Sequence, residues 1–350
     1  MSKTIFFLAD AQSIHIAKWV DYFVAQNYIV HLATFSKSNY TQAKNIYFLS
    51  SREKNIRGNY YYVVAIPKLA KLLKKIKPDV INAHYSYSMG FVALLAKKIA
   101  KIDSKFTVVC HGSDILVPPY ERIMSKINMY VLKNSDKVFA VSSQIKDKIE
   151  TYNISSDKIF VGQYGIDLQI DKVEKDIDII SNRAYYPNSR IDDLLIYLNT
   201  FQNINLKIVF VLPNIKDDDL NKLKKTYSKV IFYKHLDYNT MIQLVNRSKI
   251  YISGTKSDGT SLSLMEAMSL GCIPLVSDIV SNRSWVLDGV NGYLFYNKEQ
   301  FEKKLRFILE NYHPSHLSIS SINEKIIEDR GRYAVQMKKI SNFLINYNEK

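Results

Sequence analysis

The sequence predicts an α/β protein in which two domains each contain a parallel sheet flanked by helices. The chain has 350 residues, and a single hydrophobic core seldom extends beyond about 250–300 residues. Short apolar runs alternate with segments of helical periodicity, which is typical of parallel sheets with helices on both faces. This alternation is interrupted once, at residues 167–178, where the chain is polar and acidic without a strong period.

The first domain is predicted at residues 1–166. Its short apolar runs are expected to form strands that are buried on both faces. These runs are residues 4–8, 29–34, 80–83, 106–110, 137–141 and 159–161, with a further apolar run at 60–66. Segments with apolar residues at helical spacing lie between them. The expected helices are residues 14–23, 68–77, 90–100, 123–133 and 144–152.

Residues 167–178 are interpreted as an inter-domain linker, and residues 179–332 as the second domain. The expected strands here are residues 177–180, 207–212, 230–233, 250–253 and 273–276. The expected helices are residues 192–201, 217–227, 239–246 and 262–270. The final segment, 333–350, is predicted to be helical over residues 333–347, because its apolar residues follow helical spacing.

The chain is strongly basic, with a formal net charge of +15. Residues 1–165 carry 23 Lys or Arg and 11 Asp or Glu, a balance of +12, whereas residues 166–350 carry 25 and 22, a balance of +3. A basic face implies an anionic partner, such as phospholipid, a lipid pyrophosphate or nucleic acid. Nucleic acid is the least favoured, because no helix-turn-helix, zinc-finger or RNA-binding signature accompanies the charge.

Part of this charge lies on the expected helix at 68–77, where Lys68, Lys71 and Lys75 form one stripe and leucines with Ile76 form another. Two interpretations remain open. The helix is either an ordinary surface helix whose apolar stripe packs on the sheet, or a basic face held against anionic lipid headgroups.

The sequence predicts a cytoplasmic location, with peripheral attachment to the inner membrane face as an extension of the lipid interpretation. The apolar run after Lys3 meets Asp10 after six residues, which is too short for a signal peptide. No window approaches the ~18 apolar residues of a membrane span. Cys110 and Cys272 lie far apart and form neither a disulfide framework nor a metal-ligand cluster.

The segment 253–295 combines a strand, a polar loop, a short helix that Gly271 ends, and a second strand. In an open α/β sheet, such a loop lies at the carboxyl end of a strand, where ligands bind. The free backbone amides of the helix N-terminus favour a phosphate. The residues expected at this phosphate site are Gly259, Thr260, Ser261 and Leu262.

Two carboxylates flank this phosphate site. Asp258 precedes the helix and Glu266 lies within it, eight residues later. Carboxylates accept hydrogen bonds from hydroxyl groups. A carboxylate pair beside a phosphate site is therefore suited to the hydroxyls of a ribose and of a sugar.

This segment resembles the donor-binding signature of the family-4 retaining glycosyltransferases, which have the GT-B fold of two Rossmann-like domains facing across a cleft. The signature is an acidic residue, seven intervening residues, Glu-Ala-Met, a Gly-x-Pro turn and a DG-x-NG turn. One position departs from it, because the family usually has Glu where this chain has Asp258. The matching residues are Asp258, Glu266-Ala267-Met268, Gly271-Cys272-Ile273-Pro274, Asp288-Gly289 and Asn291-Gly292.

Residues 110–114, which follow an expected strand, resemble the family's HG-x-D loop. The resemblance implies that His111 faces the donor sugar from the first domain. His84 fits the end of the preceding family strand, where a site-lining and a structural role are both open. The remaining acceptor-side candidates of the first domain are Ser13, His15 and Asp114.

Arg183 and Arg190 follow the first strand of the second domain, where family members place an Arg and then a Lys. Guanidinium groups suit phosphate oxygens, so both are candidates for a diphosphate. The resemblance implies that these arginines hold the diphosphate, Glu266 the ribose and Asp258 the sugar. It further implies that the C-terminal helix, in residues 333–350, crosses back to the first domain. It also implies metal-independent chemistry, since arginines and a helix N-terminus neutralise the leaving diphosphate, and no Asp-x-Asp pair occurs where a metal would sit.

The resemblance therefore implies a retaining transferase that moves a hexose or N-acetylhexosamine from a nucleotide-diphosphate sugar, preferably a UDP-sugar, to a glycan acceptor. The sugar nucleotide is a co-substrate, and no cofactor is expected. A lipid-linked oligosaccharide or a lipopolysaccharide or capsule glycan is the preferred acceptor, given the basic first domain and a composition typical of AT-rich bacterial genomes. Two alternatives remain: a sugar-nucleotide epimerase on the same fold, and a non-catalytic nucleotide-sugar or glycan-binding partner of another transferase.

Overall fold

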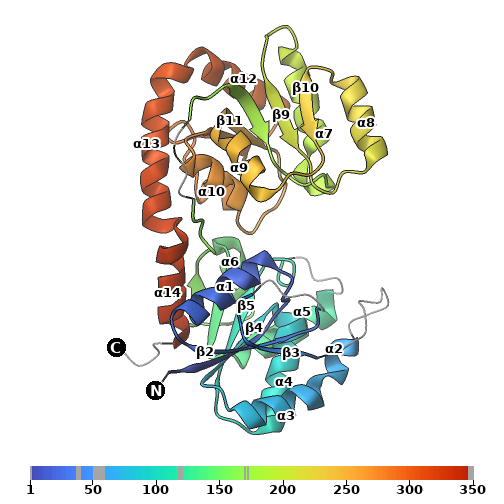
Figure 1. Cartoon of the computed structure of the whole chain (residues 1–350), viewed down its shortest axis with the longest axis vertical. Helices are drawn as coiled ribbons and strands as arrows, with labels where there is room; N and C mark the ends of the chain where they lie inside the picture. Colours follow the sequence, from blue (N-terminus) through green and yellow to red (C-terminus); the bar gives the residue numbers. More distant parts are fainter. Residues whose placement is uncertain are drawn as a thin grey trace. The chain divides into compact units, whose positions relative to one another are not determined.

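A computed structural model describes residues 2–36, 41–49, 60–116, 121–168, 171 and 173–345, which form two compact α/β units (Figure 1). Unit 1 comprises Met1–Tyr164 together with Gln336–Lys350, and unit 2 comprises Gly165–Val335. The predicted linker, 167–178, falls within unit 2, and its last two residues begin the first strand of that unit.

Unit 1 contains a parallel sheet of seven strands in the order β3-β2-β1-β4-β5-β6-β7. The interior strand β1 lies between β2 and β4, with Phe6 beside His31 and Ile81. Its apolar residues are buried on both faces, as expected for a parallel sheet covered by helices. The strands are β1 (Thr4–Leu8), β2 (Ile29–Thr34), β3 (Asn45–Phe48), β4 (Val80–His84), β5 (Lys105–Cys110), β6 (Lys137–Ala140) and β7 (Ile159–Val161).

The connections of unit 1 are helical. A π-helical turn, Ser86–Gly90, lies between β4 and α4. The helices are α1 (Ile14–Ala25), α2 (Tyr60–Val64), α3 (Ile66–Ile76), α4 (Phe91–Ala100), α5 (Glu121–Lys133) and α6 (Ser143–Glu150). The helix α14 (Tyr333–Ile345) returns to this unit from residue 336 onward, and Met337 and Ile340 are fully buried.

Unit 2 contains a parallel sheet of six strands in the order β10-β9-β8-β11-β12-β13. The strands are β8 (Ile177–Ser181), β9 (Ile208–Val211), β10 (Val230–Tyr233), β11 (Ser248–Ser253), β12 (Ile273–Ser277) and β13 (Tyr293–Phe295). The helices are α7 (Ile191–Leu198), α8 (Asp217–Thr226), α9 (Tyr238–Asn246), α10 (Leu262–Ser269), α11 (Val280–Arg283), α12 (Lys298–Glu310) and α13 (Tyr312–Arg330).

Helices cover both faces of the unit 2 sheet. Successive residues of a strand point to opposite faces, and in β8 they reach two different cores. Ile179 of β8 belongs to a core with α7, α8 and α12, whereas the next residue, Ile180, belongs to a second core with α9 and α10. Each unit is thus a doubly wound sheet. The fold class predicted from the sequence is confirmed.

The helix α10 ends as its sequence predicts. Gly271 has a φ of +74°, which only glycine adopts readily. Its amide donates to Met268, and the Cys272 amide donates to Ala267, which together form a Schellman motif. The motif turns the chain directly into β12.

The structure differs from the expected elements in three places. The apolar run at 60–66 is not extended: Tyr60–Val64 is the short helix α2, and α3 begins at Ile66. The edge strand β3, whose residues are half-exposed or exposed, had no clear signal. The strand β13 and the helices α11, α12 and α13 were also not predicted.

Candidate functional site

The carboxyl edge of the unit 2 sheet has a point where the connections diverge. The chain leaves β8 toward α7 on one face, and it leaves the neighbouring strand β11 toward α10 on the other. In doubly wound sheets the crevice between two such loops is the place where ligands bind. Arg183 follows β8 and Asp258 follows β11, so both residues lie at this point.

Arg183 is held at this edge by three side chains. Its Nη2 atom lies 2.7 Å from Oδ2 of Asp258, and both side chains are only 18% exposed. Its Nη1 atom donates to the hydroxyls of Ser261, at 3.3 Å, and Ser263, at 3.1 Å. The structure thus brings together the predicted residues Arg183, Asp258 and Ser261.

The N-terminus of α10 lies beside this guanidinium. Ser261 caps the helix and accepts a hydrogen bond from the Leu264 amide at 3.3 Å. The predicted phosphate-site residues Gly259, Thr260 and Leu262 are each partly exposed. Positive charge of Arg183 and the positive end of a helix dipole therefore coincide, which favours an anion.

Glu266 lies farther along the same helix and is 7% exposed. Its Oε1 atom accepts a hydrogen bond of 2.8 Å from the hydroxyl of Tyr238, the first residue of α9. Burial and the neighbouring Glu266 carboxylate raise the pKa of Tyr238. Tyr238 is 51% exposed and was not predicted as a site residue.

Arg190, the second predicted diphosphate ligand, has other partners. Its Nε atom lies 2.5 Å from Asp193 and its Nη2 atom 2.9 Å from the hydroxyl of Tyr197, both on α7. Its backbone has a φ of +52° at the start of α7. The guanidinium is thus bound along α7, whereas Arg183 is bound to the loop before α10.

Three of the predicted residues of unit 1, His84, His111 and Asp114, lie where β4 and β5 end. The Nδ1 atom of His84 lies 3.0 Å from Nε2 of His111, and the Tyr164 hydroxyl lies 2.6 Å from the Nδ1 atom of His111. The ring of Tyr85 stacks on His111 with centroids 4.3 Å apart. His111 is therefore fixed by aromatic side chains on several sides. Tyr164 was not predicted.

His84 has no exposed surface. Burial, with the nearby His111 as a second cause, holds the pKa of His84 well below its usual value. Trp19 packs against it edge to face, at 5.1 Å between ring centroids. The sequence left open whether His84 lines the site or has a structural role. In the structure its side chain is buried and contacts His111.

Asp114 is also fully buried, and it shapes the loop that carries His111. Its carboxylate accepts hydrogen bonds from the amides of Ser86, His111 and Gly112, at 2.8 to 3.0 Å. Burial raises its pKa, and these hydrogen bonds oppose the shift. Asp114 thus has no surface on which an acceptor could rest.

Two acceptor-side candidates lie at the start of α1. Ser13 is the N-cap residue of this helix, but its side chain makes no capping hydrogen bond. The side chain of His15 lies outside the described residues.

The DG-x-NG turn, residues 288–292, contributes to packing. Asp288 accepts the Leu294 amide at 2.8 Å, and Asn291 donates to the Trp285 carbonyl at 2.8 Å. At Gly292, a Cβ atom would lie 2.4 Å from Cγ of Pro274 in the Gly-x-Pro turn. These two motif elements hold each other in place on the edge of the sheet.

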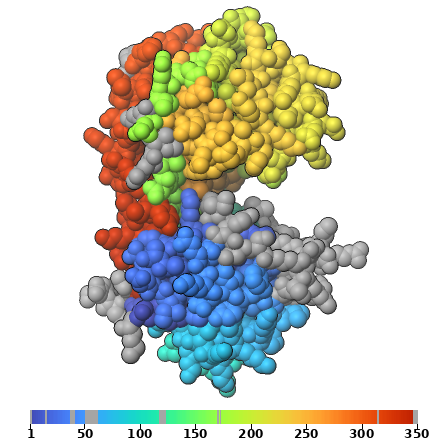
Figure 2. Space-filling view, in the orientation of Figure 1, coloured from blue at the N-terminus to red at the C-terminus, as the bar shows by residue number. Residues whose placement is uncertain are grey.

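The basic helix α3 has the two stripes that the sequence predicts. Leu69 and Leu73 are fully buried, while Lys68, Lys71 and Lys75 are exposed. The preceding helix α2 adds exposed apolar side chains, with Val64 72% exposed. Figure 2 shows α3 and α4 as part of the light-blue to cyan surface of unit 1.

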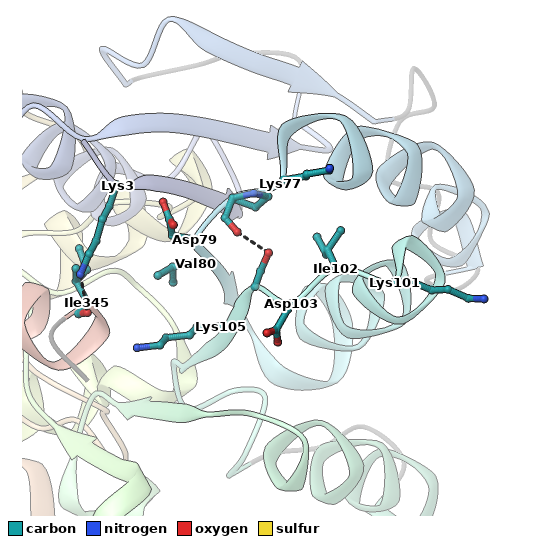
Figure 3. Close-up of a pocket in the computed structure, with 11 residues that line it drawn as sticks. Lys3, Lys77, Asp79, Val80, Lys101, Ile102, Asp103, Lys105 and Ile345 are labelled. Carbon is teal, nitrogen blue, oxygen red and sulfur yellow. Dashed lines mark hydrogen bonds between the residues drawn. The ribbon is translucent and has the colours of Figure 1, made fainter. Parts of the chain in front are cut away.

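A cavity of about 620 Å³ opens at the opposite edge of the unit 1 sheet, at the amino ends of β1, β4 and β5 (Figure 3). Lys77 and Lys101, which end α3 and α4, lie at its rim, and Figure 3 shows the Lys101 ammonium pointing away from the cavity. None of the predicted site residues lines it.

Within the described part of the chain, no cluster of three His, Cys, Asp or Glu side chains is arranged to hold a metal ion. Over the same residues, no helix combines the length and apolar character needed to cross a bilayer.

Comparison with known families assigns both units. Residues 4–142 match the family described as Glycosyl transferase 4-like, and residues 166–325 match Glycosyl transferases group 1. The chain belongs to the family-4 glycosyltransferases. The resemblance to this family is thereby confirmed, and the chain is a glycosyltransferase.

Two relatives and one solved structure resemble this glycosyltransferase at low sequence identity. It is 21% identical over 285 residues to an uncharacterized glycosyltransferase of Methanocaldococcus jannaschii, with 80% of each chain covered. It is 23% identical over 278 residues to N-acetyl-alpha-D-glucosaminyl L-malate synthase of Bacillus anthracis, with 71% of this chain and 70% of the relative covered. Its fold matches Anabaena Alr3699/HepE in complex with UDP, at a TM-score of 0.77 and 14% identity, over 98% and 100% of the two chains.

Proposed function

We propose that this glycosyltransferase moves a hexose or N-acetylhexosamine from a nucleotide-diphosphate sugar, preferably a UDP-sugar, with retention of anomeric configuration. The observation that carries the donor proposal is the order of groups at the carboxyl edge of unit 2. Asp258 and Arg183 come first, the N-terminus of α10 is next, and the Glu266 carboxylate follows.

This order corresponds to the order of groups in a sugar nucleotide. Glu266 lies five residues after Ser261, the N-cap of α10, which corresponds to a rise of about 7.5 Å at 1.5 Å per residue. That span is comparable to the distance from a diphosphate to its ribose. We assign the sugar hydroxyls to Asp258, the diphosphate to Arg183 and the helix N-terminus, and the ribose hydroxyls to Glu266.

The names of similar proteins support the same donor class. The Anabaena neighbour is described as a complex with UDP, and the Bacillus anthracis relative carries an N-acetylglucosaminyl group in its name. We propose metal-independent transfer, because the guanidinium of Arg183 and the amides of α10 can neutralise the leaving diphosphate. Arg190 would join them only by leaving Asp193 and Tyr197.

In unit 1, we propose that His111 acts near the anomeric carbon and that the acceptor binds to this unit. The preferred acceptor is a lipid-linked glycan at the inner membrane face. The proposal is supported by the +12 balance of residues 1–165 and by α3, where exposed lysines lie close in sequence to the exposed Val63 and Val64. Lysines near an anionic surface contribute about 1 kcal/mol each.

The donor assignment is tested by nucleotide binding. A thermal-shift screen across UDP, ADP and GDP should show stabilisation by UDP, since a ligand at about 100 times its Kd adds about 2.7 kcal/mol to the folded state. In calorimetry, Glu266→Ala should weaken UDP binding by about 10- to 150-fold, because a charge-assisted hydrogen bond contributes about 1.5–3 kcal/mol.

Glu299→Ala is the matched control, because Glu299 is an exposed glutamate on α12 of the same unit. It should bind UDP like the wild type. Equal UDP affinity of the wild type and the folded Glu266→Ala protein would refute α10 as the donor site. Consumption of a UDP-sugar without any acceptor would instead favour the epimerase alternative, and binding without turnover would favour the non-catalytic partner.

A further inference from the structure

The ion pair of Arg183 and Asp258 occupies the place where the proposed function puts a diphosphate. Asp258 contacts the guanidinium at 2.7 Å, and burial of both side chains limits screening by water. Burial lowers the pKa of Arg183, while Tyr251 and Asp258 raise it more, so the net shift is upward. The Asp258 carboxylate is therefore an anion that already occupies the proposed diphosphate site.

The position of Arg183 does not depend on Asp258 alone. Two hydroxyls, those of Ser261 and Ser263, accept hydrogen bonds from Nη1, whereas Asp258 binds Nη2. Removing the charge of Asp258 would leave both serine contacts in place. The guanidinium would then offer its Nη2 edge to another anion without losing its anchor.

We propose that Asp258 limits the affinity of the site for a free nucleoside diphosphate by competing with it for Arg183. A guanidinium presents its donors in a fixed fork, so a carboxylate at Nη2 occupies an edge that a phosphate would use. Binding of a diphosphate exchanges one anion for another at this edge. After transfer, the ion pair forms again and favours release of the nucleotide product.

A sugar nucleotide differs from the free diphosphate in what it offers the displaced carboxylate. Once Asp258 leaves Arg183, it can accept a hydrogen bond from a sugar hydroxyl of the donor. The free diphosphate has no such hydroxyl and leaves the carboxylate beside its own negative charge. Asp258 would thus discriminate donor from product. This inference rests on the proposed function of unit 2.

The test compares UDP and uridine binding to the wild type and to Asp258→Asn by calorimetry. Asparagine keeps the shape of the side chain and removes its charge. At a separation of about 5–6 Å, two unit charges interact strongly enough to change an affinity by 10-fold or more at an effective dielectric constant of about 20. We expect UDP binding to tighten by at least about fivefold, and uridine affinity to stay unchanged.

Asp176→Asn is the matched control. Asp176 pairs with Arg247 and Lys207 and immediately precedes β8, at the opposite edge of the same sheet. This variant removes one negative charge from unit 2 without touching Arg183, and it should bind UDP like the wild type. Asp258→Ser serves as a second variant, with the same expected tightening, if Asp258→Asn does not fold.

The outcomes separate the inference from the proposed function. If the wild type binds UDP and the Asp258 variants bind it equally or more weakly, the inferred competition by Asp258 is overturned, and the proposed function is not. Equal tightening toward UDP and uridine, or tightening in Asp176→Asn, also overturns the inferred competition. A wild type that binds none of UDP, ADP and GDP refutes the proposed function, and the inference with it.

Discussion

Gly165 is predicted to tolerate no side chain, because it lies against the backbone of another segment. A Cβ atom at this position would be 2.6 Å from Cα of Tyr333, 2.7 Å from its amide nitrogen and 2.8 Å from the carbonyl carbon of Arg332. This neighbouring segment is itself fixed. The Ile166 amide donates to Gly331 at 2.8 Å, and the Tyr333 amide donates to Ile166 at 2.8 Å.

The cost of Gly165→Ala has two parts. The backbone has a φ of +73°, and a left-handed conformation costs a residue with a Cβ about 1–2 kcal/mol. Relief of the clash requires the segments to separate and break the two hydrogen bonds, at about 1 kcal/mol each. Alanine also restricts the unfolded chain, which returns about 0.4–1 kcal/mol. We expect a net loss of about 2–3 kcal/mol in the free energy of unfolding of unit 2.

Gly289→Ala isolates the cost of the left-handed backbone conformation. Gly289 has nearly the same φ, +76°, but no atom lies within 4 Å of the Cβ position. Its expected cost is about 1 kcal/mol, which is the left-handed penalty without the clash. The difference between the two variants therefore measures the close approach at Tyr333.

The assay can follow unit 2 separately. Trp285 lies in unit 2 and Trp19 in unit 1, so Trp285 fluorescence in a Trp19→Phe background reports urea unfolding of unit 2. The free energy is obtained by linear extrapolation. Equal destabilisation by Gly165→Ala and Gly289→Ala would show that the two backbone segments are not in contact in the folded protein.

Three further predictions concern unit 1. His111→Ala and Tyr164→Phe should each lower kcat with little change in KM for the donor, as expected for interactions made mainly in the transition state; wild-type turnover in both variants would reduce these residues to loop packing. The free energy of unfolding should fall as the pH drops below 6.5, because the lowered pKa of His84 means that the unfolded chain binds a proton there and the folded chain does not. The expected decrease is up to about 1.4 kcal/mol per pH unit. An unchanged pH slope in a folded His84→Gln variant would contradict this. The protein should co-sediment with acidic but not with neutral vesicles, and added salt should weaken this binding. The binding should be lost when Lys68, Lys71 and Lys75 are changed to Glu, but kept when Lys222, Lys224 and Lys225 of α8 are changed to Glu. Equal binding to both vesicle types, or binding to neither, would leave α3 as a solvated face.

Strong periodic or apolar patterns allowed much of the fold to be predicted. The strands β2 and β10 have the predicted bounds, since each is a short apolar run between polar segments. The run at 60–66 was ambiguous, because a short apolar run has no period that separates strand from helix. In the structure, Tyr62 packs edge to face on Phe35 at 4.5 Å, a contact that the local sequence does not encode.

In the candidate site, too, the residues that are close in sequence could be predicted, and those that meet only through the fold could not. Asp258, Ser261 and Glu266 lie on one loop and one helix, so their spacing places them together. Tyr238 and Tyr164 reach their partners Glu266 and His111 across 28 and 53 residues. Such contacts depend on how strands are ordered in a sheet, and no motif in the sequence marks them.

The return of α14 to unit 1 makes the biosynthesis of that unit discontinuous. Phe343 of α14 packs on Phe160 with ring centroids 5.1 Å apart, and Leu344 is buried. A ribosome that adds about 5–20 residues per second must translate the whole of unit 2, Gly165–Val335, before this helix is made. For about 10–30 seconds the nascent first unit therefore exposes the apolar surface that α14 will cover. This interval favours chaperone binding at that surface, whereas unit 2 is contiguous and can fold as soon as it emerges.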